Sequence, residues 1–104
     1  MAYFLYKLIP PRPAFPDGMS DAESAIMQRH FAYWAAHVES GTAVVFGPVV
    51  DPSGNYAIAV LELEDGADPS ALGVEDPAIT ANAGFRFEVH PMPQITKAGA
   101  PSRR

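Results

Sequence analysis

Residues 20–41, SDAESAIMQRHFAYWAAHVESG, decide the fold because they predict one long helix with both ends marked. Ser20 and Glu23 have the spacing of a capping box, in which each side chain accepts a backbone N–H of the other residue. Gly41 is the expected left-handed stop. On a helical wheel one arc collects the mostly apolar positions Ile26, Met27, His30, Phe31, Trp34, His37 and Val38. His30 is therefore expected on the buried side of the helix.

Four runs rich in apolar and branched side chains predict β-strands. They are residues 3–9, 43–50, 56–63 and 85–90. Pro10-Pro11 ends the first run, because proline removes a backbone donor. The turn residues 51–55, DPSGN, join the second and third runs as a hairpin.

Two short helical openings precede the last strand. Asp68-Pro69 and Asp76-Pro77 each place an aspartate as N-cap before a proline at the first helical position. The first of these helices is expected to falter at Gly73. The resulting order is βαββαβ, which predicts an α+β fold of the ferredoxin-like type, with an antiparallel sheet and helices on one face.

The second face of this sheet also needs a cover. The strand residues expected there are apolar, namely Tyr3, Leu5, Ala57, Ala59, Leu61 and Leu63. Strands that are apolar on both faces indicate burial on both sides, so we predict a homodimer formed through the sheet face.

Composition excludes several classes of partner. The 104 residues carry a net charge of -5 with only seven Lys and Arg, which argues against nucleic acid and anionic membrane surfaces. The absence of cysteine excludes disulfides, a thiol nucleophile and thiolate metal sites. The N-terminus has neither a signal-peptide pattern nor a run long enough to span a membrane, so a cytoplasmic location is expected.

A set of spaced residues carries a resemblance to a known family. The set is His30, Gly41, Gly47-Pro48, Gly54, Asp76-Pro77 and Gly84. On these residues the chain resembles the YCII-related family of small dimeric α+β proteins over residues 1–93, and residues 94–104 are expected to form a flexible tail. The resemblance implies a ferredoxin-like fold of the dimeric α/β barrel type, a homodimer, and an active site on His30 and Asp76. One relative is a cofactor-independent dehydrochlorinase that acts on a hydroxylated chloroaromatic ring.

The chemistry of the two candidate catalytic residues fits this implication. A neutral imidazole such as His30 can remove or return a proton, and a carboxylate such as Asp76 can fix its tautomer and stabilise the imidazolium. The substrate-binding wall is expected from Trp34, Phe46 and Gly47-Pro48, with Phe31 and Tyr33 as further aromatic candidates. Residues 10–19, with four prolines and a glycine, form a stiff loop that can act as a lid. The predicted function is cofactor-independent lyase or isomerase chemistry on a small cyclic or aromatic molecule.

Other interpretations of the same residues stay open. His30 can be a satisfied core histidine and Asp76 a plain helix cap, which leaves a small-molecule-binding module or a structural dimer. A cofactor-free oxygenase rests on fold analogy alone. No metal site is expected, because His30 and His37 lie ~10 Å apart along one helix. Arg86 is a candidate for holding an anionic group of a substrate, and the alternative is an ion pair on the surface.

Overall fold

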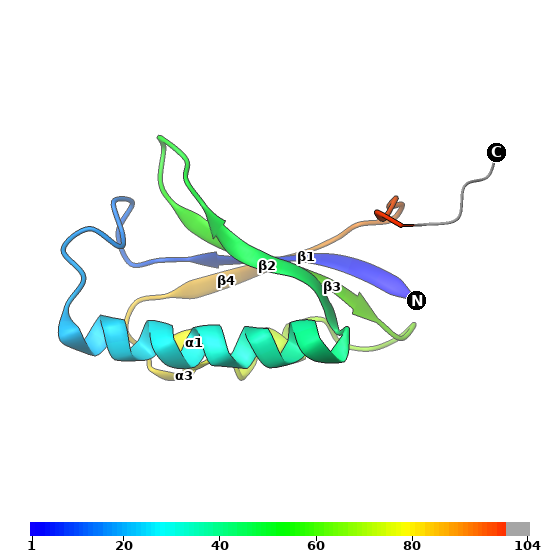
Figure 1. The fold of residues 1–104 in the computed structure, drawn as a ribbon, viewed down its shortest axis with the longest axis horizontal. Helices are drawn as coiled ribbons and strands as arrows, with labels where there is room; N and C mark the ends of the chain where they lie inside the picture. Colours follow the sequence, from blue (N-terminus) through cyan, green and yellow to red (C-terminus); the bar gives the residue numbers. More distant parts are fainter. Residues whose placement is uncertain (100–104) are drawn as a thin grey trace.

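A computed structural model describes residues 1–99 as a four-stranded antiparallel sheet with helices against one face (Figure 1). The strand order is β2-β3-β1-β4. The elements along the chain are β1 (Ala2–Ile9), α1 (Asp21–Ser40), β2 (Ala43–Val49), β3 (Tyr56–Leu63), α2 (Ser70–Val74), α3 (Pro77–Thr80) and β4 (Arg86–Pro91). The predicted α+β class and the antiparallel sheet are confirmed, and the strand ends differ from the predicted ones by single residues.

The ends of α1 are those that its sequence predicts. The Ser20 side chain accepts the Glu23 N–H, the Glu23 side chain accepts the Ser20 N–H, and Gly41 is left-handed with φ 87°. The buried stripe of the helix is narrower than predicted and consists of Ile26, His30 and Trp34. Two members of the predicted arc are exposed, Phe31 at 55% and Val38 at 41%. The buried positions of α1 are spaced by four, and Met27 and Tyr33 pack against the core as partly buried neighbours.

The two faces of the sheet differ from the predicted assignment. Tyr6 lies opposite Ala59, and both are buried toward the helices. Tyr3 lies opposite Glu62 and Leu5 opposite Val60, so these residues occupy the other face. The prediction that Tyr3 and Leu5 share a face with Ala57, Ala59, Leu61 and Leu63 is therefore wrong. Period-two alternation cannot identify the inner face when both sides of a strand are apolar, because the pairing register sets it.

The connection from β3 to β4 differs from the prediction at two points. α2 begins at Ser70, one residue later than Asp68-Pro69 predicts, and the Asp68 carboxylate accepts the Ser70 N–H. Gly73 lies inside α2 and is buried under the ring of Phe87, where a side chain would collide. Gly73 is thus a packing position, and it does not end the helix.

The far end of the chain lies partly outside the described residues. Within the predicted tail 94–104, Lys97 approaches the Glu62 carboxylate at 3.3 Å and lies over the Tyr3 ring.

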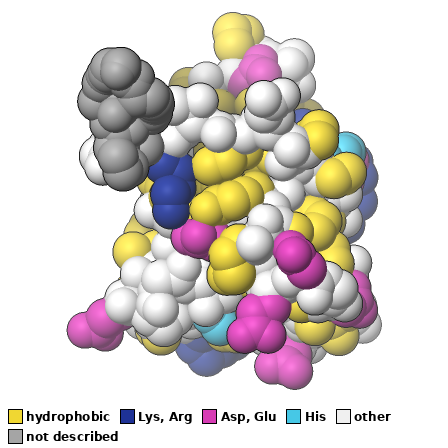
Figure 2. Space-filling view, turned by 90° about the vertical axis from the view of Figure 1, so that its right-hand side faces the viewer, with side chains coloured by type: hydrophobic (Ala, Val, Ile, Leu, Met, Phe, Trp, Pro, Cys, Tyr) yellow, Lys and Arg dark blue, Asp and Glu magenta, His cyan; other side chains and the backbone are white. Residues whose placement is uncertain are grey.

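From the right-hand side of Figure 1, hydrophobic side chains form a group bordered by acidic and basic ones (Figure 2). Among residues 1–99 no helix is long and apolar enough to cross a membrane.

Candidate functional site

Asp76 is the centre of a buried hydrogen-bond network. It is the N-cap of α3, where its Oδ1 accepts the Ala78 N–H at 2.9 Å, and its exposed fraction is 0%. Its Oδ2 accepts the Tyr6 hydroxyl from β1 and the Trp34 indole N–H from α1, each at 2.8 Å. His30 of α1 supplies the remaining donor. Helix-cap chemistry therefore places the carboxylate, and tertiary packing brings three side chains to it.

Opposing effects act on the charge of Asp76. Burial would raise its pKa, but hydrogen bonds from His30, Trp34 and the Ala78 backbone stabilise the charged form and hold the pKa below its usual value. An ionised carboxylate accepts hydrogen bonds and donates none, so its partners must all be donors. Asp76 is thus a buried anion whose neighbours are arranged for that charge.

His30 presents its two ring nitrogens to different surroundings. Nδ1 lies 2.9 Å from Oδ1 and 3.0 Å from Oδ2 of Asp76, so Nδ1 carries the hydrogen. No described residue forms a hydrogen bond with Nε2. Among the described residues every fully buried side-chain nitrogen or oxygen has a hydrogen-bond partner, so Nε2 is not fully buried. Nε2 therefore keeps access to the adjoining cavity and, in the neutral ring, is an unprotonated base.

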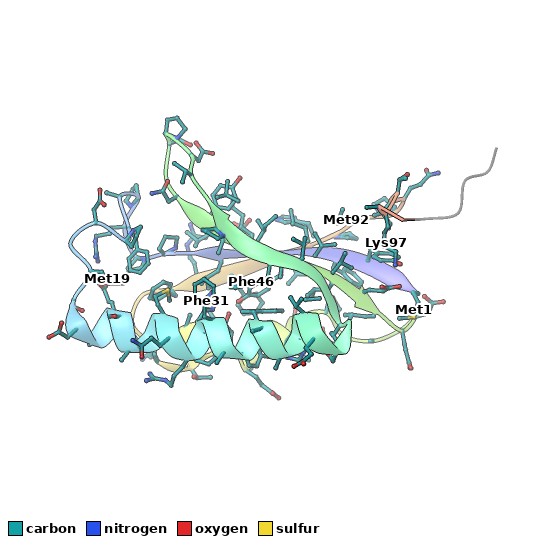
Figure 3. All side chains as sticks on the ribbon, in the orientation of Figure 1. Met1, Met19, Phe31, Phe46, Met92 and Lys97 are labelled. Atoms are coloured by element: carbon teal, nitrogen blue, oxygen red, sulfur yellow. The ribbon has the colours of Figure 1, made fainter. Side chains whose placement is uncertain are left out.

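A cavity of about 320 Å³ adjoins His30. Its walls are almost entirely apolar. Phe31 of α1 and Phe46 of β2 lie between the helix and the sheet, and Met19 lies at the end of the loop before α1 (Figure 3). The complete lining is Leu8, Pro10, Phe15, Pro16, Met19, Met27, His30, Phe31, Phe46, Pro48, Val49, Val50, Asn55, Tyr56, Ala57 and Phe85. A space of this size holds a small organic ring, and its polarity favours a largely apolar ligand.

Residues 10–19, which we call the strap, close one side of the cavity. Arg12 in the strap makes two hydrogen bonds of 2.9 Å to the Glu23 carboxylate on α1. The Asn55 side chain donates to the Phe15 carbonyl at 3.0 Å. The strap is therefore tied to both the helix and the β2–β3 hairpin, and Phe15 is held against Phe85 at 5.3 Å between ring centres.

Replacing Arg12 by glutamine is expected to loosen the strap. Hydrogen bonds from Arg12 and from the Ser20 backbone lower the pKa of Glu23 to about 2, so this tie persists as the solution is acidified and is lost only as the pH falls through that value. We expect faster hydrogen exchange in R12Q at the Phe15 and Asn55 amides, whose hydrogen bonds close the strap. Arg29→Gln, at an exposed position of α1, is the matched control. Equal exchange rates in R12Q and wild type would contradict the tie.

The predicted site residues divide into two groups in the structure. His30 and Asp76 come together, and Phe46 and Pro48 line the cavity beside His30, as does Phe31. Trp34 and Gly47 do not line it. Trp34 is fully buried behind His30 as a donor to Asp76, because one turn of helix places it beside the carboxylate.

The two remaining candidates lie away from the cavity. The Tyr33 hydroxyl donates to the Leu72 carbonyl at 2.6 Å. Arg86 is exposed, approaches Glu88 at 3.6 Å and lines a separate polar hollow. Neither residue lines the cavity beside His30.

Several residues of the site were not predicted. Tyr6 completes the Asp76 network, and the strap residue Phe15, with Met27 and Phe85, supplies cavity wall. The one available signal was the position of Tyr6 on an apolar strand, since a buried tyrosine hydroxyl needs a hydrogen-bond partner. Within residues 1–99 no three His, Asp or Glu side chains come close enough to hold a metal ion.

The family model of the YCII-related domain matches residues 1–93. No curated protein matches the chain.

Proposed function

The chain belongs to the YCII-related domain family, and from this premise we propose that it is a cofactor-independent lyase or isomerase in which His30 is the general acid and base. One observation carries the proposal. His30 binds a fully buried carboxylate through Nδ1 while its Nε2 adjoins an apolar cavity of about 320 Å³. A histidine with a purely structural role in the core does not require an adjoining cavity. An aspartate that only caps a helix does not require a histidine partner.

The proposed reaction begins with proton transfer to Nε2. His30 removes an acidic proton from a carbon of a bound ring. The electron pair of the broken C–H bond forms a new π bond while the electrons of the neighbouring bond shift onto a carbonyl oxygen of the substrate or leave with a departing group. Asp76 stabilises the imidazolium that results. The proton then returns to another carbon in an isomerisation, or a leaving group departs with its electron pair in an elimination. Phe31 and Phe46, with ring centres 5.3 Å apart, supply apolar walls for the ring.

Deuterium uptake from solvent tests this function even while the reaction product is unidentified. A panel of substituted phenols and of cyclic ketones with slow spontaneous exchange is incubated in D₂O with the protein and followed by NMR. We expect accelerated exchange at one carbon of at least one compound. We also expect other compounds that fill the cavity to inhibit this exchange in a saturable manner. Binding without accelerated exchange for every compound in the panel would favour the second function below.

Non-catalytic binding of a small molecule is the second candidate. The observation that favours it is the low polarity of the cavity walls. The side-chain amide of Asn55, one of the few polar groups in the lining, is already engaged with the Phe15 carbonyl and the Asp51 N–H. A site with so few available polar groups can hold a ligand by one hydrogen bond to His30 without stabilising a second developing charge.

We also propose that the fold is ferredoxin-like and that two copies pair through the uncovered sheet face into a dimeric α/β barrel. The strand order β2-β3-β1-β4 with helices on one side supports the fold assignment. Val60 supports the pairing, because it lies opposite both Leu5 and Val45 on the face away from α1. Apolar groups at the centre of an open sheet face favour a cover.

Replacing Val60 by lysine is expected to convert the dimer into a monomer. The substitution places an unpaired charge at the centre of the proposed interface, where burial of a charge is strongly unfavourable. Analytical ultracentrifugation of wild type and V60K measures the change in mass. Ala36→Lys makes the same change in charge on an exposed turn of α1 and should remain dimeric. A monomeric wild type, or a dimeric V60K, would contradict the proposed interface.

A further inference from the structure

Two neutral donors meet the same oxygen of Asp76. The Tyr6 hydroxyl and the Trp34 indole N–H both bind Oδ2 at 2.8 Å, and both side chains are at most 1% exposed. They come from β1 and α1, so the sheet and the helix each supply one. The proposed reaction uses Asp76 to orient His30 and to stabilise its imidazolium, and it assigns no task to either donor.

Both donors affect the carboxylate that His30 binds. A hydrogen bond to the charged form of a carboxyl stabilises that charge, and each neutral donor takes a share of it. Less negative charge then remains to attract the Nδ1 hydrogen of His30. Burial and the Asp76 charge raise the pKa of Tyr6 above its ordinary value, so Tyr6 remains a protonated donor in neutral solution.

We propose that Tyr6 and Trp34 are positioning residues that set the strength of the His30–Asp76 hydrogen bond by sharing the charge on Oδ2. The catalytic meaning of this inference rests on the proposed function, because a weaker hold on Nδ1 makes Nε2 a weaker base. The hydrogen-bond network itself exists with or without turnover. The inference can therefore be tested separately.

Few other titratable groups approach this network. His37 of α1 packs with its ring 5.6 Å from the Trp34 ring. Tyr33 faces it from α1, and burial followed by the charges of Glu75 and Asp76 raises the pKa of Tyr33 to about 12. Glu75 precedes Asp76 in the chain and is exposed. The residues that β2, β3 and β4 direct toward the helices are apolar, among them Phe46, Ala59, Leu61, Phe87 and Val89. Tyr6 and Trp34 are thus the neutral side-chain donors through which the described residues modulate the Asp76 charge.

Tyr6→Phe is the sharpest variant, and Tyr33→Phe is its matched control. Y6F removes one hydroxyl from Oδ2 and keeps the ring that packs 4.8 Å from Trp34. Y33F removes a hydroxyl that binds the Leu72 carbonyl, from a ring 5.2 Å from Trp34. The two variants lose the same atom near the same indole, but only one of them loses a bond to Asp76.

Proton and ¹⁵N NMR of the histidine rings measures the hydrogen bond directly, with exposed His90 as an internal reference. We expect the Nδ1 hydrogen of His30 to move downfield in Y6F, because the bond to Asp76 strengthens, and to stay in place in Y33F. A 3-fluorotyrosine at position 6 keeps the fold and is a stronger donor, so it should move the same resonance upfield. If Y6F does not fold, this replacement decides the question.

Three results would overturn the inference: an unmoved resonance in folded Y6F, an unmoved resonance with 3-fluorotyrosine, or equal shifts in Y6F and Y33F. A purely structural Tyr6 predicts lower stability without a change in the Nδ1 hydrogen. For any compound whose exchange the protein accelerates, the acid limb of the rate–pH profile should move to higher pH in Y6F. The NMR shifts without any turnover would uphold the charge sharing and reject only the enzymatic function.

Discussion

Replacing Asp76 by asparagine is expected to destabilise the protein by about 3 kcal/mol, the upper end of the usual cost of leaving a buried donor without an acceptor and of losing a hydrogen bond to a charged group. Asp76 is fully buried and accepts four donors, from Tyr6, His30, Trp34 and the Ala78 backbone. An asparagine side chain has one oxygen and one NH₂ group, so at least one of these donors would face another donor. Unfolding in urea, followed by circular dichroism, measures the loss.

Asp68→Asn is the matched control for this variant. Asp68 is exposed and accepts the Ser70 N–H at the start of α2, so it is also an aspartate at a helix N-terminus. Because loss of an exposed cap typically costs about 1 kcal/mol or less when an amide replaces the acid, D68N should differ clearly from D76N. Equal losses for the two variants would show that Asp76 acts only as a cap.

The effect of D76N also has a defined pH dependence. The pKa of Asp76 is lower in the folded protein than its usual value, so its ionised form contributes stability above the pKa of the unfolded chain, about 3.9. That contribution is lost as the pH falls through the folded-state pKa. The difference in unfolding free energy between wild type and D76N should therefore shrink in acid. A difference that grows in acid would contradict an ionised Asp76.

The parts of the fold that local chemistry determines could be predicted from the sequence. The capping box at Ser20 and Glu23 and the left-handed Gly41 place the ends of α1 because they depend on residues within one turn. Asp76 was predicted as a helix cap for the same reason. The association of His30 with Asp76, 46 positions apart, came from family resemblance, since no local rule connects residues at that separation.

The parts that depend on how elements pack could not be predicted. Trp34 follows His30 by one helical turn, which places both on the buried side without saying which of them meets the cavity and which meets Asp76. Tyr6 lies on a strand that is apolar on both faces, so only the pairing with Ala59 shows that it points inward. The wall formed by Phe15 depends on ties from Arg12 and Asn55 to separate elements.

Replacing His30 by asparagine is expected to reduce any accelerated exchange or turnover by about 10²–10⁴-fold, the usual contribution of a general base. The asparagine NH₂ group can take the place of Nδ1 as a donor to Asp76, but nothing replaces Nε2 at the cavity. The buried carboxylate keeps a partner in H30N, so the loss of stability should be smaller than in D76N. Deuterium uptake and urea unfolding together separate the two effects.

His37→Asn is the control that distinguishes a catalytic histidine from a structural one. His37 lies on the same helix, and its ring packs 4.8 Å from Tyr33 and 5.6 Å from Trp34, away from the cavity. If His30 is the base, H37N should retain exchange activity and respond to pH as wild type does, whereas H30N should lose both. Full exchange activity in folded H30N would exclude His30 as the base. Ligand affinity lost in H30N, for compounds that wild type binds but does not exchange, would leave His30 as a hydrogen-bonding residue of a binding protein.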